Sequence, residues 1–257
     1  MMKIQVASDI HLEFRCREMG QILKPSADIL ILAGDICVLG AAEDRDTFTK
    51  FIDLYSKRYK HILHVAGNHE YYSGEKQDVL SMGDIHKFLA KLGKQYPNYS
   101  FLHNKVLPLT DPRTKKTYNF AGTTLWTHIP EDKMKFIQES MNDYAKILVK
   151  QEILTPDMVN RLHKEAVSFL RRTLKTHKNI VLITHHKPFL DPQPKNPFSV
   201  AYEVDLQHLL KPPVLAAIHG HTHQHFQSKM NGVTVVSNPR GYPYERTNFN
   251  PAFVINI

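Results

Sequence analysis

The side chains best suited to chemistry in this chain are carboxylates, imidazoles and one amide, and each follows a short apolar run. Five runs end in this way: IQVAS before Asp9 and His11, ILILAG before Asp35, HILHVAG before Asn68 and His69, IVLIT before His185, and LAAIHG before His221 and His223. Mixed imidazole and carboxylate ligation suits Mn, Fe, Zn or Co better than Ca or Mg. The sequence therefore predicts a metal site with these ligands: Asp9, His11, Asp35, Asn68, His185, His221 and His223.

Strands are the elements that would bring these ligands together. A run of Val, Ile, Leu and Ala that ends in Gly or a polar residue is typical of a buried strand that gives way to a loop. Loops at the carboxyl ends of strands share one rim of an open α/β sheet, where ligands bind. Asp9 and His11 are two residues apart, as are His221 and His223, so each pair would point the same way on extended backbone.

The first part of the chain alternates strands and helices. We expect strands at Lys3–Ala7, Asp28–Ala33 and His61–Ala66, with one helix beginning near Asp44 and another at about Gly83–Gln95. This βαβα order implies parallel strands joined by right-handed crossovers.

The second part is richer in short strands, interrupted by two helices. We expect short strands from Tyr99 to Trp126, helices near Asp132–Lys150 and Thr155–Thr176, and then strands at Ile180–Thr184, Ala216–Ile218, Phe226–Lys229, Val233–Ser237 and Phe253–Ile257. Two sheets packed face to face with helices outside fit this order. We expect one domain over residues 1–257, with a helical elaboration at about 127–178.

Composition bounds the class of protein. The chain has 257 residues, of which 42% are apolar, so it can build a sizeable core. We expect a cytoplasmic protein, because the charged N-terminal region is unlike a secretory signal and no run approaches the length of a membrane span. The cysteines, Cys16 and Cys37, are too few for a disulfide framework. Cys37 is near Asp35, but we interpret it as a small buried residue rather than a metal ligand.

Positive charge dominates the chain and has one notable concentration. The formal net charge is +8, which favours acidic substrates in general. On the predicted helix that begins at Pro156, basic residues fall on one side at helical spacing: Arg161, Lys164, Arg171 and Lys175, with Lys178 just past its end. A solvated helix face explains this pattern, and contact with nucleic acid is the less favoured interpretation.

The motifs D-x-H, G-D, G-N-H-E, H and G-H-x-H occur in that order, and together they resemble the calcineurin-like metallophosphoesterase superfamily. The resemblance implies a mixed α/β fold, a four-layer αββα sandwich of two mixed sheets flanked by helices. It also implies two divalent metal ions. Asp9, His11, Asp35 and His223 would bind the first, and Asp35, Asn68, His185 and His221 the second, so that Asp35 bridges them.

The resemblance further implies a hydrolytic mechanism. A hydroxide that bridges the two metals would attack phosphorus in line. His69 would act as the general acid or organise it, and Glu70 would orient His69. Many relatives continue the G-D block as G-D-x-x-D-R, whereas this chain has Gly-Asp-Ile-Cys-Val-Leu. The resemblance is therefore to small phosphohydrolases rather than to Ser/Thr protein phosphatases.

Three other features bear on the site. His185 and His186 compete for one ligand position, and we expect His185 to fill it, with His186 beside it near the substrate. Arg240, in the turn Asn238-Pro-Arg-Gly-Tyr, is either a clamp for a phosphate oxygen or a surface arginine. The polar residues of Met141-Asn-Asp-Tyr either face the site or lie on a helix surface, and we favour the helix surface.

The resulting hypothesis is a metal-dependent phosphoesterase that acts on small phosphate monoesters or diesters. Two alternatives are a non-catalytic adaptor on the same fold, as in the retromer subunit that resembles this superfamily, and a nuclease. The filled ligand positions and His69 favour the enzyme over the adaptor. Selectivity lies in loops such as Lys187–Ser199, so the substrate does not follow from the sequence, and neither do the native metal pair and the oligomeric state.

Overall fold

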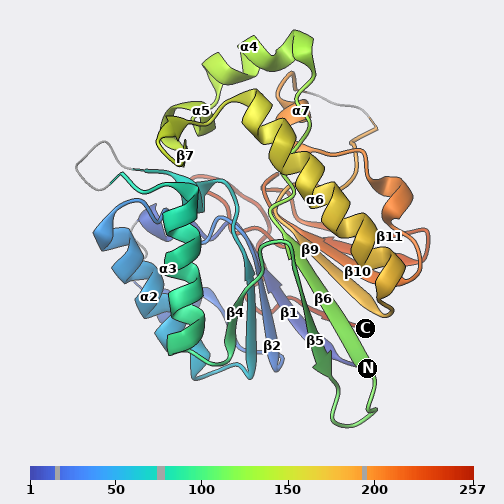
Figure 1. Cartoon of the computed structure of the whole chain (residues 1–257). Helices are drawn as coiled ribbons and strands as arrows, with labels where there is room; N and C mark the ends of the chain where they lie inside the picture. The colour runs from blue at the N-terminus through green and yellow to red at the C-terminus, as the bar shows by residue number, and fades with distance from the viewer. Residues whose placement is uncertain (15–17, 74–78, 193–195) are drawn as a thin grey trace.

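The computed structural model describes residues 1–14, 18–73, 79–192 and 196–257, so Cys16 lies outside the described residues. Two sheets form its centre (Figure 1). The first has the order β13-β1-β2-β3-β4, built from Val254–Asn256, Lys3–Ala7, Ile29–Ala33, His61–Val65 and Tyr99–Phe101. The second has the order β11-β12-β10-β9-β6-β5, built from Phe226–Met230, Val233–Ser237, Val214–His219, Ile180–Thr184, Thr117–Thr123 and Lys105–Thr110.

Both sheets are mixed. In the first sheet β1, β2, β3 and β4 run parallel and β13 joins β1 antiparallel. In the second sheet β12, β10, β9 and β6 run parallel, and β11 and β5 are antiparallel edges. The parallel strands are buried on both faces, which is why ILILA and IVLIT are continuous apolar runs rather than alternating ones.

Helices cover the two outer faces. The helices α2 (Ala42–Ser56) and α3 (Met82–Gln95) pack on the first sheet. The apolar face of α2, made of Phe48, Phe51, Ile52 and Tyr55, is buried in that layer. The helix α6 (Pro156–Thr176) packs on the second sheet through Ala166, Phe169 and Leu170. A third apolar layer lies between the sheets, where Ile31 and Val181 belong to one cluster. The predicted αββα sandwich is therefore confirmed.

The remaining short elements gather mainly at one end of the sandwich. They are the 3-10 turns Leu12–Phe14, His69–Tyr71 and Gln207–Leu209, the helices α1 (Met19–Ile22), α4 (Glu131–Ser140), α5 (Asp143–Lys146) and α7 (Ser199–Tyr202), and the hairpin of β7 (Leu148–Val149) and β8 (Glu152–Ile153). Figure 1 shows α4, α5 and α7 at the end opposite the two chain termini. None of the helices in the described ranges combines the length and the apolarity that a bilayer span requires.

The single helix predicted near Asp132–Lys150 is wrong. The chain leaves the helical region at Met141 (φ −108°, ψ 137°), makes one turn of α5 and then forms the β7–β8 hairpin, in which Lys150 has a φ of 59°. The cause is a tertiary contact: Asp143 is buried and its carboxylate accepts hydrogen bonds from Asn68 and Tyr72. By contrast, α6 begins as predicted, with the Thr155 hydroxyl accepting a hydrogen bond from the Met158 amide.

Candidate metal centre

The first group of predicted ligands meets where β1 and β10 end. One ligand atom each from Asp9, His11 and His223 lies within 4.8 Å of the others. The Nε2 atoms of His11 and His223 are 3.2 Å apart, and His223 Nε2 is 3.5 Å from Asp9 Oδ1. Three donor atoms of this kind, directed at one point, are a geometry in which a divalent transition metal binds.

The second group lies beside the first. One ligand atom each from Asp35, His185 and His221 lies within 4.8 Å of the others. His185 Nε2 is 3.1 Å from His221 Nδ1, 3.1 Å from Asn68 Oδ1 and 3.4 Å from Asp35 Oδ1. The other oxygen, Asp35 Oδ2, lies 4.0 Å from His11 Nε2 in the first group. The two oxygens of Asp35 therefore face the two groups.

Backbone geometry at the strand ends directs these side chains inward. Five predicted ligands have a left-handed φ: Asp9 (51°), His11 (52°), Asp35 (54°), His221 (69°) and His223 (50°). This region is unfavourable for residues other than glycine and, where it occurs, concentrates at functional sites. The side chains within the pairs Asp9–His11 and His221–His223 converge as expected. They do so because the backbone of these residues is left-handed, whereas we predicted extended backbone.

Gly67 makes room for the second group. A Cβ atom built on Gly67 would overlap Asp35 Oδ1 and the ring of His185. Glycine is therefore required in HILHVAG because two ligands pass directly over its backbone.

Outer partners fix the orientation of the imidazoles. His11 Nδ1 lies 2.9 Å from Glu13 Oε1, His185 Nδ1 lies 2.9 Å from the Ala33 carbonyl, and His223 Nδ1 contacts Glu245. Donation from Nδ1 leaves the Nε2 lone pair of each ring free to bind a metal. Sequence reasoning missed both glutamates. Glu13 continues the spacing of D-x-H as D-x-H-x-E, which is a usable signal, whereas Glu245 lies in a loop without a motif.

The charges of the cluster are strongly interdependent. Burial raises the pKa of Asp35, but the positive charges of His185, His69 and His11, together with the hydrogen bond from His185, outweigh burial and hold that pKa well below its usual value. Burial opposes protonation of His185, but Asp35 raises its pKa to about 10. In the metal-free protein, protons on the histidines thus balance the carboxylates, and metal binding has to displace them.

The cluster fits divalent metal ions. Asp9 Oδ2 and His221 Nε2 are buried atoms with no hydrogen-bond partner in the described part of the chain. A buried polar atom without a partner costs about 1–3 kcal/mol. Carboxylate, amide and imidazole donors that converge on one point are the donor set of a metal site.

His69 lies beside the two groups, at the surface of a cavity. Its Nδ1 is 3.1 Å from Glu13 Oε1, its Nε2 is 3.2 Å from the Tyr242 hydroxyl, and its ring stacks on Tyr72 with centroids 4.3 Å apart. Its amide donates to Asp35 Oδ1 at 2.9 Å. Burial lowers the pKa of His69, but Asp35 and Glu13 outweigh it, so that the pKa is raised.

The prediction that Glu70 orients His69 is wrong. The Glu70 carboxylate is fully buried and accepts hydrogen bonds from the amides of Asp35 (2.9 Å), Ile36 (2.7 Å) and Gly67 (2.6 Å). It thus ties together the loops after β2 and β3, out of reach of a substrate. Glu13 occupies the position against the His69 ring that we expected for Glu70.

Two predicted substrate contacts lie outside the cavity. His186 is buried with Nδ1 3.1 Å from the Thr124 carbonyl, and burial lowers its pKa to about 3, so it stays neutral. The Arg240 guanidinium donates to the Ile10 carbonyl at 3.0 Å. Neither residue is among those that line the cavity. Cys37 is buried, and burial raises the pKa of its thiol, which disfavours the thiolate that a metal requires.

A cavity of about 610 Å³ opens over the second group. Its floor includes Asp35, Asn68, His69, His221 and His223, and its wall comes from residues 140–143, from Asp191, Asn196, Phe198, Ser199, Tyr202 and Glu203, and from Thr222, Gln224, Tyr242 and Glu245. Our preference for a helix-surface position of Met141-Asn-Asp-Tyr is therefore wrong for Met141, Asn142 and Asp143, which line the cavity. No residue of α6 lines it.

Comparisons with known proteins agree with this architecture. The model of a family described as calcineurin-like phosphoesterase matches residues 2–225. An uncharacterised protein of Acanthamoeba polyphaga mimivirus is 31% identical over 280 residues, which cover 99% of this chain and 96% of the viral protein.

Solved structures share the fold at low sequence identity. The phosphopantetheinyl hydrolase of Mycobacterium tuberculosis superposes with a TM-score of 0.73 and 17% identity, over 94% of this chain and 90% of that chain. The protein TT1561 of Thermus thermophilus superposes with a TM-score of 0.57 and 14% identity, over 93% of this chain and 89% of that chain.

Proposed function

This chain belongs to the calcineurin-like phosphoesterase family, and we propose that it hydrolyses small phosphate esters with two divalent metal ions bound at the carboxyl ends of its strands. The first ion would bind to Asp9, His11, Asp35 and His223, and the second to Asp35, Asn68, His185 and His221. The observation that carries this proposal is Asp35, whose two carboxylate oxygens face the two groups of imidazoles.

Metal ions bound there would supply the activated water and the neutralisation of the phosphoryl oxygens. Hydrolysis adds the oxygen of water to phosphorus, breaks the bond to the ester oxygen and returns a proton to that oxygen. The protein's own contribution is geometric: Asn68 keeps Oδ1 toward His185 because its Nδ2 donates to Asp143 (2.9 Å). No serine or cysteine nucleophile is required.

His69 is the residue that would protonate the leaving oxygen. Glu13 accepts from Nδ1, so the proton available to a substrate is the one on Nε2, which points toward Tyr242 at the cavity surface. Asp35 and Glu13 outweigh burial and raise the pKa of His69, which favours the protonated ring that this role needs. Stacking on Tyr72 holds the ring in this direction.

The adaptor and nuclease alternatives receive less support. An adaptor needs neither a complete ligand set nor a cavity over it, and both are present. A nuclease would place cations beside the reacting phosphate, yet the basic residues of α6 lie outside the cavity.

Hydrolysis of 4-nitrophenyl phosphate and of bis(4-nitrophenyl) phosphate with added manganese tests the proposal. We expect turnover by the wild type, near two metal ions per chain, and loss of turnover in Asp35→Asn and His69→Ala. His69→Ala should keep its metal, whereas Asp35→Asn should lose part of it. Arg172→Ala, on the outer surface of α6, is the matched control. Unchanged turnover in both site variants would reject the assigned roles.

A further inference from the structure

The leaving group of the proposed reaction would begin beside Tyr242. His69 would return a proton to the ester oxygen from Nε2, and that atom lies 3.2 Å from the Tyr242 hydroxyl. The group attached to the ester oxygen would therefore lie close to the Tyr242 ring, which lines the cavity. The surroundings of this ring then decide which leaving groups bind well.

Two exposed aromatic side chains extend the surface of Tyr242 beyond the cavity. The centroid of the Phe14 ring lies 5.4 Å from that of Tyr242, edge to face, and the centroid of Tyr244 lies 5.7 Å from it at an interplanar angle of 30°. Phe14 is 49% exposed and Tyr244 is 80% exposed. Neither is among the residues that line the cavity, so we define the three rings as an aromatic platform at its edge.

A closed turn fixes the backbone that carries Tyr244. The Glu245 amide donates to the Tyr242 carbonyl at 2.9 Å, which makes Tyr242-Pro-Tyr-Glu a β-turn with Pro243 at its second position and Tyr244 at its third. The Glu245 carboxylate also accepts from the Tyr242 amide at 2.8 Å and contacts His223. The turn is thus tied to the first proposed metal site, and it presents Tyr244 at a set distance from that site.

The chemistry of an exposed ring favours one kind of partner. Aromatic pairs with centroids about 4.5–7 Å apart gain an attraction beyond the burial of apolar area, because the negative face of one ring meets the positive edge of the other. The hydrophobic effect alone scales with apolar area, so it favours a saturated ring at least as strongly as a planar one. A preference for the planar ring therefore reports stacking.

We infer that the platform of Phe14, Tyr242 and Tyr244 binds a planar aromatic or heteroaromatic leaving group by stacking. Aromatic phosphate esters are then hydrolysed in preference to saturated ones of the same size. This inference rests on the proposed function, because it places the leaving group of that reaction against the platform.

Two esters, 2-phenylethyl phosphate and 2-cyclohexylethyl phosphate, test the inference on the manganese-loaded protein. Two methylene groups separate each ring from the ester oxygen, so the two leaving alcohols have similar acidity. We expect kcat/KM, measured from the phosphate released, to be about 3- to 10-fold higher for the phenyl compound, chiefly through KM. Equal values, or faster hydrolysis of the cyclohexyl compound, would overturn the inference while leaving the proposed function intact.

The chromogenic ester 4-nitrophenyl phosphate distinguishes failure of the inference from failure of the proposed function. If it is turned over while the two alkyl esters are not, their inhibition constants against it replace kcat/KM, and the same preference for the phenyl compound is expected. Absence of turnover with 4-nitrophenyl phosphate as well would reject the proposed function, and the inference with it.

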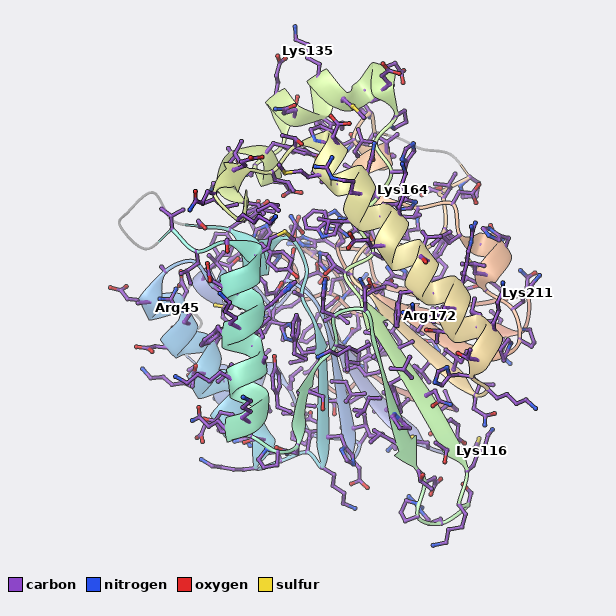
Figure 2. All side chains as sticks on the ribbon, viewed as in Figure 1. Arg45, Lys116, Lys135, Lys164, Arg172 and Lys211 are labelled. Carbon is purple, nitrogen blue, oxygen red and sulfur yellow. The ribbon has the colours of Figure 1, made fainter. Side chains whose placement is uncertain are left out.

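Substitutions in the platform locate the effect. Tyr244→Leu keeps an apolar side chain but removes the ring, so it should lower the phenyl-to-cyclohexyl ratio by about twofold or more, and adding Phe14→Leu should bring the ratio close to one. Tyr244→Phe is the matched control and should keep the wild-type ratio. Lys164→Gln, at a position that Figure 2 labels on α6, should also keep it. A wild-type ratio in the double variant would overturn the assignment of the preference to the platform.

Discussion

The floor and the wall of the cavity are built in different ways. The floor residues, like the predicted ligands Asp9, His11 and His185 beside them, follow the ends of buried parallel strands whose neighbours fix their register. The floor is made of Asp35, Asn68, His69, His221 and His223. The wall, as described above, comes from helix ends and loops. Floor positions are therefore constrained by the whole sandwich, while wall positions are constrained locally. Chemistry should depend on the first and selectivity on the second.

The largest effect should come from the floor residue that both groups share. Asp35→Ala removes the oxygens that face both groups and should lower kcat/KM by about a thousandfold or more. Metal content, measured by atomic emission, should fall in parallel. An Asp35→Ala variant that keeps its metal content and its turnover would contradict the claim that the chemistry depends on the floor.

The absence of a side chain at Gly67, next to Asp35 and His185, should affect kcat/KM almost as strongly as the proposed ligands do. Gly67→Ala forces a methyl group against Asp35 and His185 and should cost about a hundredfold in kcat/KM, because small displacements of reacting groups have effects of that size. Gly83→Ala is its control, since a Cβ there meets only the Ser81 hydroxyl at 3.6 Å. Equal activity of the two variants would show that the close approach at Gly67 is not needed.

Glu13 and Glu245 are the carboxylates that orient imidazoles of the site. The loss of activity on substituting each one should increase with the number of imidazoles that it contacts. Glu13 contacts both His11 and His69, whereas Glu245 contacts His223 alone among the imidazoles. Glu13→Gln should therefore lower activity more than Glu245→Gln, within the range of about 10- to 100-fold that outer-shell changes cost. The reverse order, at matched metal content, would contradict this ranking.

Wall substitutions should alter KM and leave the metal in place. Tyr202→Ala removes an aromatic face near His221 and should raise KM by about 3- to 10-fold with little change in kcat. Loss of metal from this variant would show that the wall and the floor are not separable.

The smallest effect should come from outside both regions. Thr155→Ala removes the hydroxyl that caps α6 and should lower the free energy of unfolding by about 1 kcal/mol, as measured by urea denaturation. Its kcat/KM should match that of the wild type, because no residue of α6 lines the cavity.

The same division explains what could be predicted from the sequence. The convergence of the candidate ligands was predictable because buried strands have a distinctive composition and their carboxyl ends share a rim. His185 rather than His186 faces the other ligands because it is the first residue after β9. The positions of Glu70, Asp143 and Arg240 were not predictable, because each depends on contacts between loops that carry no periodic pattern.

The ligands are drawn from residue 9 near one end of the sequence to residue 223 near the other, and β13 then lies beside β1. During synthesis, a ribosome-bound chain that has not yet released the H-x-H segment has an incomplete pair of groups. The two proposed metal sites would therefore form only once the H-x-H segment has folded beside the end of β1.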